Sequence, residues 1–180
     1  REMELNILDW FQTLHTPILD KIMTSITKLG DAGIFWIILT LLFLIIPKMR
    51  KTGIIMAAAL IMDLLICNVA VKNLVARTRP YDVNTSVQLL VAKLHDYSFP
   101  SGHTAASFAS VTALYLAGEK KLWKPALVLA CLIAVSRLYL YVHYPTDVLA
   151  GAVIGILCGA AASKLTEMAA AAREARRDSG

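Results

Sequence analysis

The chain has 180 residues, of which 57% are hydrophobic and 17% are charged, and its formal net charge is +5. A soluble domain usually carries about a quarter charged residues, whereas here the few charges cluster between long apolar runs. These features exclude an ordinary soluble domain and indicate a polytopic membrane protein. The sequence contains no basic stripe on a solvated face, so we expect no nucleic-acid partner.

Residues 1–30 form the first predicted unit, an amphipathic segment that is broken at Pro17. Trp10 in its first half suits the headgroup region of a membrane. In its second half, isoleucine recurs at helical spacing from Ile18 to Ile26. We interpret the segment as two interfacial helices, with a short transmembrane span in the second half as the alternative. Its mixed polarity argues against a cleavable signal peptide.

Residues 31–165 form the predicted core, which we expect to be an all-α transmembrane helix bundle. A transmembrane helix needs about 20 mostly apolar residues. Together with the open alternative in the amino-terminal segment, the apolar stretches predict five or six transmembrane helices. The five stretches are 31–46, 53–75, 102–117, 122–140 and 146–165.

Two features inside these stretches need an explanation. Asp63 lies in the middle of the second stretch, where an ionised carboxylate is costly. We favour a structural pairing within the bundle, and a functional route is the alternative. Gly151, Gly155 and Gly159 recur every four residues in the last stretch, which indicates close helix packing.

Basic residues in the connectors predict the orientation in the membrane. Three groups of them fall on the same side of the alternating spans, which the positive-inside rule assigns to the cytoplasm. The groups are Lys48, Arg50 and Lys51; Lys120, Lys121 and Lys124; and Arg173, Arg176 and Arg177 in a polar carboxy-terminal tail, 166–180. Residues 72–103 and 136–147 then share the opposite, outer face.

The outer face contains three clusters of polar residues. Single residues of these kinds usually have structural roles, so only their combination indicates a function. The clusters are Lys72 followed after six residues by Arg79-Pro80; Pro100-Ser101-Gly102-His103; and Ser136-Arg137, followed after five residues by His143 and after three more by Asp147.

Three cations of these clusters, Lys72, Arg79 and Arg137, lie near the ends of stretches that must be neighbours in one bundle. Without a counter-anion they would repel one another, and the acidic residues nearby are too few and too spread in the sequence to neutralise them all. A bound phosphate is the natural counter-anion. The guanidinium of arginine matches two phosphate oxygens, and lysine adds a compact charge.

The other residues of the clusters supply groups for phosphoryl transfer. Ser101 is a good N-cap, and Gly102 permits close backbone approach at a helix start, where free N–H groups bind anions. His103 in the first turn is placed to protonate a leaving oxygen. Asp147 is close enough to His143 to accept a hydrogen bond from one ring nitrogen, which leaves the other nitrogen bare to attack phosphorus.

The three clusters together resemble the signature of the type 2 phosphatidic acid phosphatase superfamily. This superfamily also includes glucose-6-phosphatase, bacterial acid phosphatases and vanadium haloperoxidases. Its pattern is Lys, six residues, Arg-Pro; Pro-Ser-Gly-His; and Ser-Arg, five residues, His, three residues, Asp, and every fixed position is met here. The resemblance covers roughly residues 50–165.

The resemblance implies a phosphatase that forms a phosphohistidine on His143, with Asp147 orienting that ring. It also implies that His103 protonates the leaving group and later activates water. No metal or other cofactor is expected, because the cations neutralise the charge that Mg²⁺ neutralises in other phosphoryl-transfer enzymes. The residues implied to hold the phosphate are Lys72, Arg79, Arg137, Ser101 and the backbone of Gly102.

The membrane setting favours a lipid phosphate as the substrate, with the loop 81–99 as the predicted specificity element. Compactness and the outward-facing site resemble the bacterial undecaprenyl diphosphate phosphatases of cell-wall metabolism. A phosphatidylglycerophosphate or phosphatidic acid phosphatase is the alternative. A non-enzymatic binder or transporter of anionic lipids is the alternative of another class. The sequence leaves the oligomeric state open.

Overall fold

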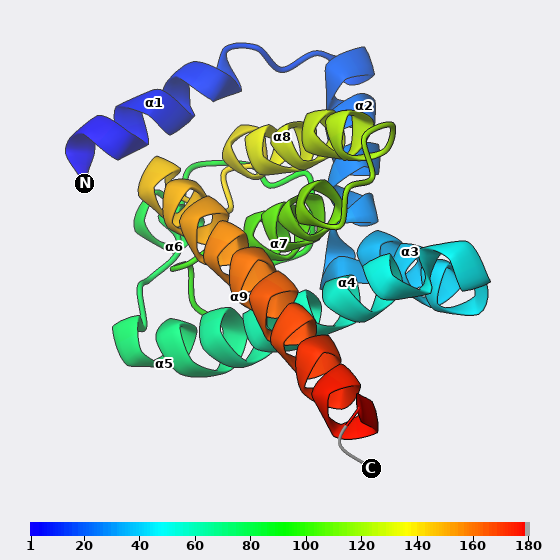
Figure 1. Ribbon diagram of the computed structural model, residues 1–180. Coiled ribbons are helices and arrows are strands. Elements are labelled where there is room, and N and C mark those ends of the chain that lie inside the picture. The colour runs from blue at the N-terminus through cyan, green and yellow to red at the C-terminus, as the bar shows by residue number, and fades with distance from the viewer. Residues whose placement is uncertain (179–180) are drawn as a thin grey trace.

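The computed structural model describes residues 1–178, which are all-helical and contain no strand, as the sequence predicts. Figure 1 shows how the helices are arranged. The α-helices are α1 (Glu2–Gln12), α2 (Pro17–Leu29), α3 (Ile34–Ile45), α4 (Arg50–Asp63), α5 (Lys72–Val75), α6 (Pro80–Val83), α7 (Gly102–Leu116), α8 (Trp123–Tyr139) and α9 (Pro145–Asp178). Two 3-10 helices, η1 (Asp31–Gly33) and η2 (Pro47–Met49), and a π-helix, η3 (Leu64–Val71), lie between them.

The chain is a helical membrane protein, although helix length alone supports fewer spans than the five or six predicted. Among the described residues, two helices are long and apolar enough to cross a membrane, Pro47–Val83 and Pro145–Asp178. A third candidate joins Pro17–Leu29 to Asp31–Ile45 across a 44° bend. Helices α7 and α8 have 15 and 17 residues, which is less than the roughly 20 that a span needs.

The glycine stripe of α9 packs against α7, and these two helices cross closely in Figure 1. A Cβ atom added to Gly151 would lie 2.6 Å from the carbonyl oxygen of Ser101. One added to Gly155 would overlap the carbonyl oxygen of Ala105. The close packing predicted from the glycine spacing is therefore confirmed, and it joins the second and third clusters rigidly.

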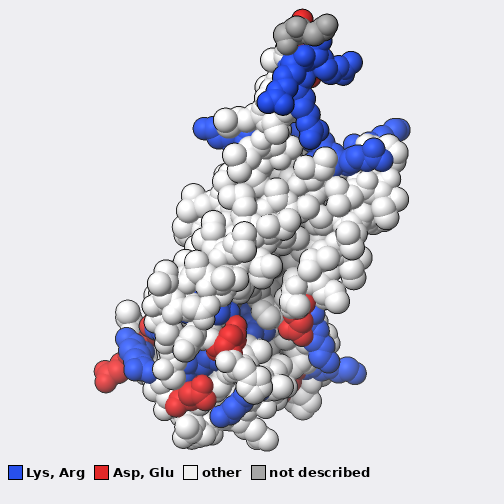
Figure 2. Space-filling model, turned by 90° about the horizontal axis from the view of Figure 1, so that it is seen from below, with Lys and Arg blue, Asp and Glu red and all other residues white. Residues whose placement is uncertain are grey.

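Uncharged side chains form a belt between two charged ends (Figure 2). The end that carries the carboxyl terminus shows mainly lysine and arginine, whereas the other end carries both signs. The 34-residue helix α9 is about 50 Å long, so it connects one end to the other. It continues through most of the predicted tail, 166–180, of which residues 179–180 lie outside the described residues.

The amino-terminal helices are tied to the carboxyl end of α8. Leu8 of α1 is fully buried, and the Gln12 side chain donates to the carbonyl oxygen of Tyr139 at 3.1 Å. The Tyr139 hydroxyl donates to Asp20 of α2 at 2.5 Å. Helix α2 begins at Pro17 because the Thr16 hydroxyl caps its first turn. This pair of helices therefore supports the loop that follows α8.

Candidate functional site

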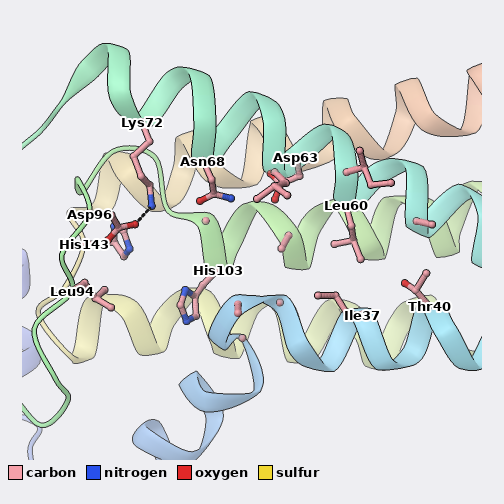
Figure 3. A pocket seen from close by; sticks show the side chains of 18 of the residues that line it. Ile37, Thr40, Leu60, Asp63, Asn68, Lys72, Leu94, Asp96, His103 and His143 are labelled. Carbon is pink, nitrogen blue, oxygen red and sulfur yellow. Dashed lines mark hydrogen bonds and ion pairs between the residues drawn. The ribbon is translucent and has the colours of Figure 1, made fainter.

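A cavity of about 530 Å³ collects residues from all three sequence clusters. Figure 3 shows Lys72, His103 and His143 converging at one end of it. The predicted site residues that line the cavity are Lys72, Arg79, Gly102, His103 and His143. Those that are buried without lining it are Ser101, Arg137 and Asp147.

His143 lies in the loop between α8 and α9, and its side chain is 2% exposed. Its Nδ1 lies 2.7 Å from the backbone carbonyl oxygen of Ser98. A carbonyl can only accept, so Nδ1 carries the proton and Nε2 is bare. Nε2 lies 3.4 Å from Nη1 of Arg79. Burial lowers the pKa of His143 to about 3, and the charges of Arg137 and Arg79 add to this. The ring is therefore neutral at physiological pH.

The contact between Asp147 and His143 differs from the one that the sequence predicts. The nearest Asp147 oxygen lies 3.6 Å from Nδ1 of His143, which is too far for a hydrogen bond. That oxygen accepts instead from the Ser98 hydroxyl at 2.5 Å and from the backbone N–H of Tyr144 at 2.9 Å. Ser98 therefore connects the two residues, since its carbonyl binds one and its hydroxyl binds the other.

Ser98 and Arg77 are site residues that sequence reasoning missed. Arg77 binds Asp147 through Nη1 at 2.5 Å and Glu4 through Nη2 at 2.6 Å. Its guanidinium also stacks on the ring of Tyr144 at 3.8 Å. The available signal was position alone, because Ser98 stands just before the second cluster and Arg77 just before Arg79.

Two of the predicted phosphate ligands share a carboxylate, that of Asp96. Its two oxygens each bind one cation at 2.5 Å, Oδ2 the Nζ of Lys72 and Oδ1 the Nη2 of Arg79. Asp96 is one of the acidic residues that the sequence suggests are too few and too spread to neutralise all three cations, but the loop before α7 folds back and brings it to two of them. Burial alone would raise the pKa of Asp96, yet Lys72 and Arg79 outweigh it and lower the pKa to about 2.

The third predicted cation, Arg137 in the last turn of α8, remains without a carboxylate among residues 1–178. Its Nη1 donates to the hydroxyl of Thr27 at 2.5 Å, and its buried Nε has no partner in that part of the chain. A buried guanidinium with an unused donor is costly. An anion beside it would satisfy this donor.

The start of α7 differs in one detail from the prediction. Ser101 occupies the N-cap position, but its side chain makes no capping hydrogen bond. Its hydroxyl is fully buried and accepts from the Thr104 hydroxyl at 3.0 Å. The Nε2 of His103 lies 2.8 Å from Oδ1 of Asp31. Sequence reasoning missed Asp31, because we assigned it to the beginning of an apolar span.

From these polar residues the cavity continues as an apolar groove between α3 and α4 (Figure 3). Asp63 lines this groove and is 2% exposed. Its Oδ1 has no hydrogen-bond partner among the described residues, so the structural pairing that we favoured is absent at this oxygen. The apolar walls are formed by Ile37, Leu41, Leu44, Leu60, Ile61 and Leu64.

Three of the predicted phosphate ligands are cationic side chains. In the described part of the chain, no three or more His, Cys, Asp or Glu side chains gather where they could hold a metal ion. Lys72, Arg79 and Arg137 are each no more than 7% exposed. A phosphate ester in the cavity would therefore meet two buried cations that line it, Lys72 and Arg79.

Comparison with known proteins gives one family. The pattern of the PAP2 superfamily matches residues 52–170. An undecaprenyl-diphosphatase of Sulfolobus acidocaldarius is 34% identical over 137 residues, which are 76% of this chain and 66% of that protein.

Two crystal structures share the fold. One is LpxE of Aquifex aeolicus, with a TM-score of 0.78, 29% identity and coverage of 89% of this chain and 94% of that one. The other is a transmembrane PAP2-type phosphatidylglycerolphosphate phosphatase of Bacillus subtilis, with a TM-score of 0.74, 28% identity and coverage of 93% and 86%. The fold and the family match therefore extend over most of the chain.

Proposed function

Because the chain belongs to the PAP2 superfamily, we propose that it is an integral membrane lipid phosphatase with His143 as its nucleophile. One observation carries this proposal. The bare Nε2 of a buried, neutral His143 faces Arg79 at 3.4 Å, at the polar end of a cavity that continues into an apolar groove. That arrangement suits a lipid phosphate, with its phosphate beside the nucleophile and its hydrocarbon chain in the apolar groove.

The reaction has two steps. His143 accepts and releases the phosphoryl group, and His103 gives and takes the proton. Nε2 of His143 attacks phosphorus, the bond from phosphorus to the leaving oxygen breaks, and His103 gives that oxygen a proton. Water then attacks the phosphohistidine, the phosphorus–nitrogen bond breaks, and His103 takes the proton from the water. The products are inorganic phosphate and the dephosphorylated lipid.

The cations stabilise the phosphoryl oxygens in place of a metal ion. Lys72 and Arg79 lose Asp96 and bind the phosphate, and Arg137 offers its unused donor. The backbone at Gly102 and the buried Ser101 complete the binding site at the start of α7. His143 keeps its orientation throughout, because Ser98 holds Nδ1 and Asp147 holds Ser98.

We propose undecaprenyl diphosphate as the substrate, which is hydrolysed to undecaprenyl phosphate. The relative from Sulfolobus acidocaldarius supports this choice by its name. The groove also suits a long hydrocarbon, since its walls are apolar and much of α3 and α4 beside it is exposed. A phosphatidylglycerophosphate phosphatase is the second candidate, which the Bacillus subtilis structure supports.

The proposed site faces the outer side of the cell membrane. The carboxyl end of α9 carries Arg173, Arg176 and Arg177, and basic residues favour the cytoplasmic side. The site lies at the amino end of the same helix, about 50 Å away. A membrane-impermeant probe that labels a cysteine introduced at Glu174 from outside intact cells would contradict this orientation.

The test of the activity is phosphate release by purified protein in detergent from undecaprenyl diphosphate, phosphatidylglycerophosphate and phosphatidic acid. We expect His143→Ala to abolish release from every lipid. Radioactive phosphate from the terminal position should label the wild-type protein under an acid-free quench. Label that persists on His143→Ala would contradict the nucleophile assignment, and a protein that binds these lipids without releasing phosphate would be a binder or transporter.

The leaving group separates the two lipid candidates. A diphosphate expels a phosphate, which is a better leaving group than the alkoxide expelled from a phosphate monoester. The acid His103 should therefore matter less for the diphosphate. We expect His103→Ala to slow monoester hydrolysis more than diphosphate hydrolysis, and an equal loss on both lipids would contradict this role.

A further inference from the structure

We propose that Asn68 is a specificity-determining residue that binds the leaving phosphate of a lipid diphosphate. This inference rests on the proposed function, because it assumes that the reacting phosphate binds at Lys72 and Arg79. It adds a second polar position to the site. That position lies about one helical turn deeper in the groove than Lys72 and next to the start of α7 (Figure 3).

Asn68 and Lys72 are four residues apart and would share one face of any α-helix, and the π-helix η3 brings Asp63 to the same face. Asp63 and Lys72 are nine residues apart, which is about 2.5 turns of α-helix, so regular α-helix would point them to opposite sides. The i to i+5 hydrogen bonding of a π-helix turns the chain less per residue. Asp63, Asn68 and Lys72 consequently line the same cavity and point the same way in Figure 3. Such π segments are rare and often mark functional sites.

Asn68 also lies beside the proposed acid. A Cβ atom added to Gly102 would be 2.5 Å from Oδ1 of Asn68, so the carboxamide packs directly against the residue that precedes His103. The oxygen that His103 protonates must lie within hydrogen-bond reach of that imidazole. In a lipid diphosphate this oxygen belongs to the second phosphate. In a lipid monophosphate it carries the hydrocarbon.

The side chain of Asn68 is free to bind a ligand. It makes no hydrogen bond to any other residue within 1–178 and is partly buried in the cavity wall. A carboxamide offers two N–H donors, and a phosphate oxygen is a strong acceptor. As the phosphorus–oxygen bond breaks, negative charge grows on the leaving phosphate, and these donors stabilise it.

Asp63 sets the depth at which the second phosphate binds. Its carboxylate lies deeper in the same groove, nearly fully buried and with one oxygen unpartnered among the described residues. This carboxyl group offers a phosphate no positive charge, and in its ionised form it would repel one. The second phosphate is therefore held at the level of Asn68, and the uncharged chain passes Asp63.

The experiment compares a prenyl diphosphate with the prenyl monophosphate of the same chain length, using full-length protein in detergent. For Asn68→Leu, we expect kcat/KM for the diphosphate to fall roughly ten- to a hundredfold, as for a lost hydrogen bond to a charged group. We expect the monophosphate to change by less than about threefold. Asn68→Asp, which keeps the shape but adds a negative charge, should impair the diphosphate further.

Thr40→Val is the matched control, because Thr40 lines the far part of the same groove and, among the described residues, its hydroxyl bonds only to the carbonyl oxygen of Trp36. It should affect both substrates equally. Equal losses on both substrates for Asn68→Leu and Asn68→Asp would overturn the inference while leaving the phosphatase proposal intact. A wild-type protein that hydrolyses the monophosphate but not the diphosphate would overturn both the inference and the proposed substrate.

Discussion

The backbone carbonyl of Ser98 accepts the Nδ1–H of His143 at 2.7 Å, whereas the Ser98 hydroxyl donates to Asp147 at 2.5 Å. A single serine thus links a histidine and a carboxylate that do not bond to each other. The orienting group of the histidine is a main-chain atom, which side-chain substitution cannot remove. Substitution of Asp147 should therefore leave the Ser98 carbonyl in place to orient the His143 ring.

Loss of the Asp147 charge should slow the enzyme less than loss of His143. In Asp147→Asn the Ser98 carbonyl still holds Nδ1, but Arg77 loses its buried partner. We expect kcat to fall about 10- to 100-fold, which corresponds to roughly 1.4–2.8 kcal/mol of the barrier. Phosphate release at saturating lipid measures the effect.

Ser98→Ala provides the comparison, because it removes the hydroxyl and keeps the carbonyl. We expect a loss of kcat of less than about tenfold, in line with one neutral donor removed from a carboxylate that retains Arg77 and the Tyr144 N–H. A Ser98→Ala variant as inactive as His143→Ala would show that the hydroxyl, not the carbonyl, orients the ring.

Removal of the Asp96 charge should strengthen phosphate binding. This carboxylate binds both Lys72 and Arg79, so phosphate must displace it. For Asp96→Asn we expect the inhibition constant of inorganic phosphate to fall about fivefold or more, because the competing charge is gone. Product inhibition of lipid hydrolysis measures this constant.

Asp82→Asn is the control for Asp96→Asn. Asp82 also pairs with a lysine, Lys93 at 3.5 Å, but both side chains are largely exposed, and exposed pairs contribute little. Phosphate inhibition of this variant should match that of the wild type. Weaker phosphate inhibition of Asp96→Asn than of the wild type would mean that Asp96 holds the cations in place and does not compete with the ligand.

The pH profile should reflect the lowered pKa of His143. A histidine ordinarily titrates near pH 6.5, but burial lowers the pKa of His143 to about 3. Protonation blocks Nε2, so this residue should remain active as pH falls through 6 and 5. We expect no loss of kcat/KM near pH 6.5 that is due to His143. Its protonation should act only near pH 3.

The same shift has a consequence for stability, with its sign set by which state binds the proton. Between about pH 6.5 and 3 the unfolded chain protonates this histidine and the folded protein does not. Its contribution is therefore complete above pH 6.5 and is lost as pH falls toward 3. Thermal unfolding in detergent should show a wild-type Tm that falls more than that of His143→Gln across this window. Parallel curves for the two proteins would contradict the lowered pKa.

The contact between α7 and α9 should be sensitive to one methyl group. In Gly155→Ala the new Cβ would overlap the carbonyl oxygen of Ala105, so the helices must separate. We expect Tm to fall by about 5 °C or more, since overpacking costs about 1–3 kcal/mol. Ile156→Ala, at an exposed neighbouring position, should change Tm by much less. An unchanged Tm for Gly155→Ala would show that the two helices can move apart at little cost.

The fold class, one helix contact and the convergence of the polar clusters could be predicted from the sequence alone. Apolar runs of nearly membrane-spanning length and the four-residue glycine spacing are local patterns. They therefore predicted an all-α membrane protein and the close packing of α9 without any tertiary information. The three polar clusters predicted which residues converge, because helices of one bundle bring their ends to the same face. The family followed from the same spacing, whereas the roles of these residues remain predictions.

Only the tertiary structure decided how these residues are paired. Asp96 reaches Lys72 and Arg79 because a loop folds back over them, and Ser98 comes between His143 and Asp147 for the same reason. The π-helix turns Asp63 toward the groove that Asn68 and Lys72 also line. Whether two side chains form a hydrogen bond depends on differences of about an ångström in atomic position and on how far each residue rotates the helix. Sequence spacing measures neither of these, so it predicted the site residues without their network of contacts.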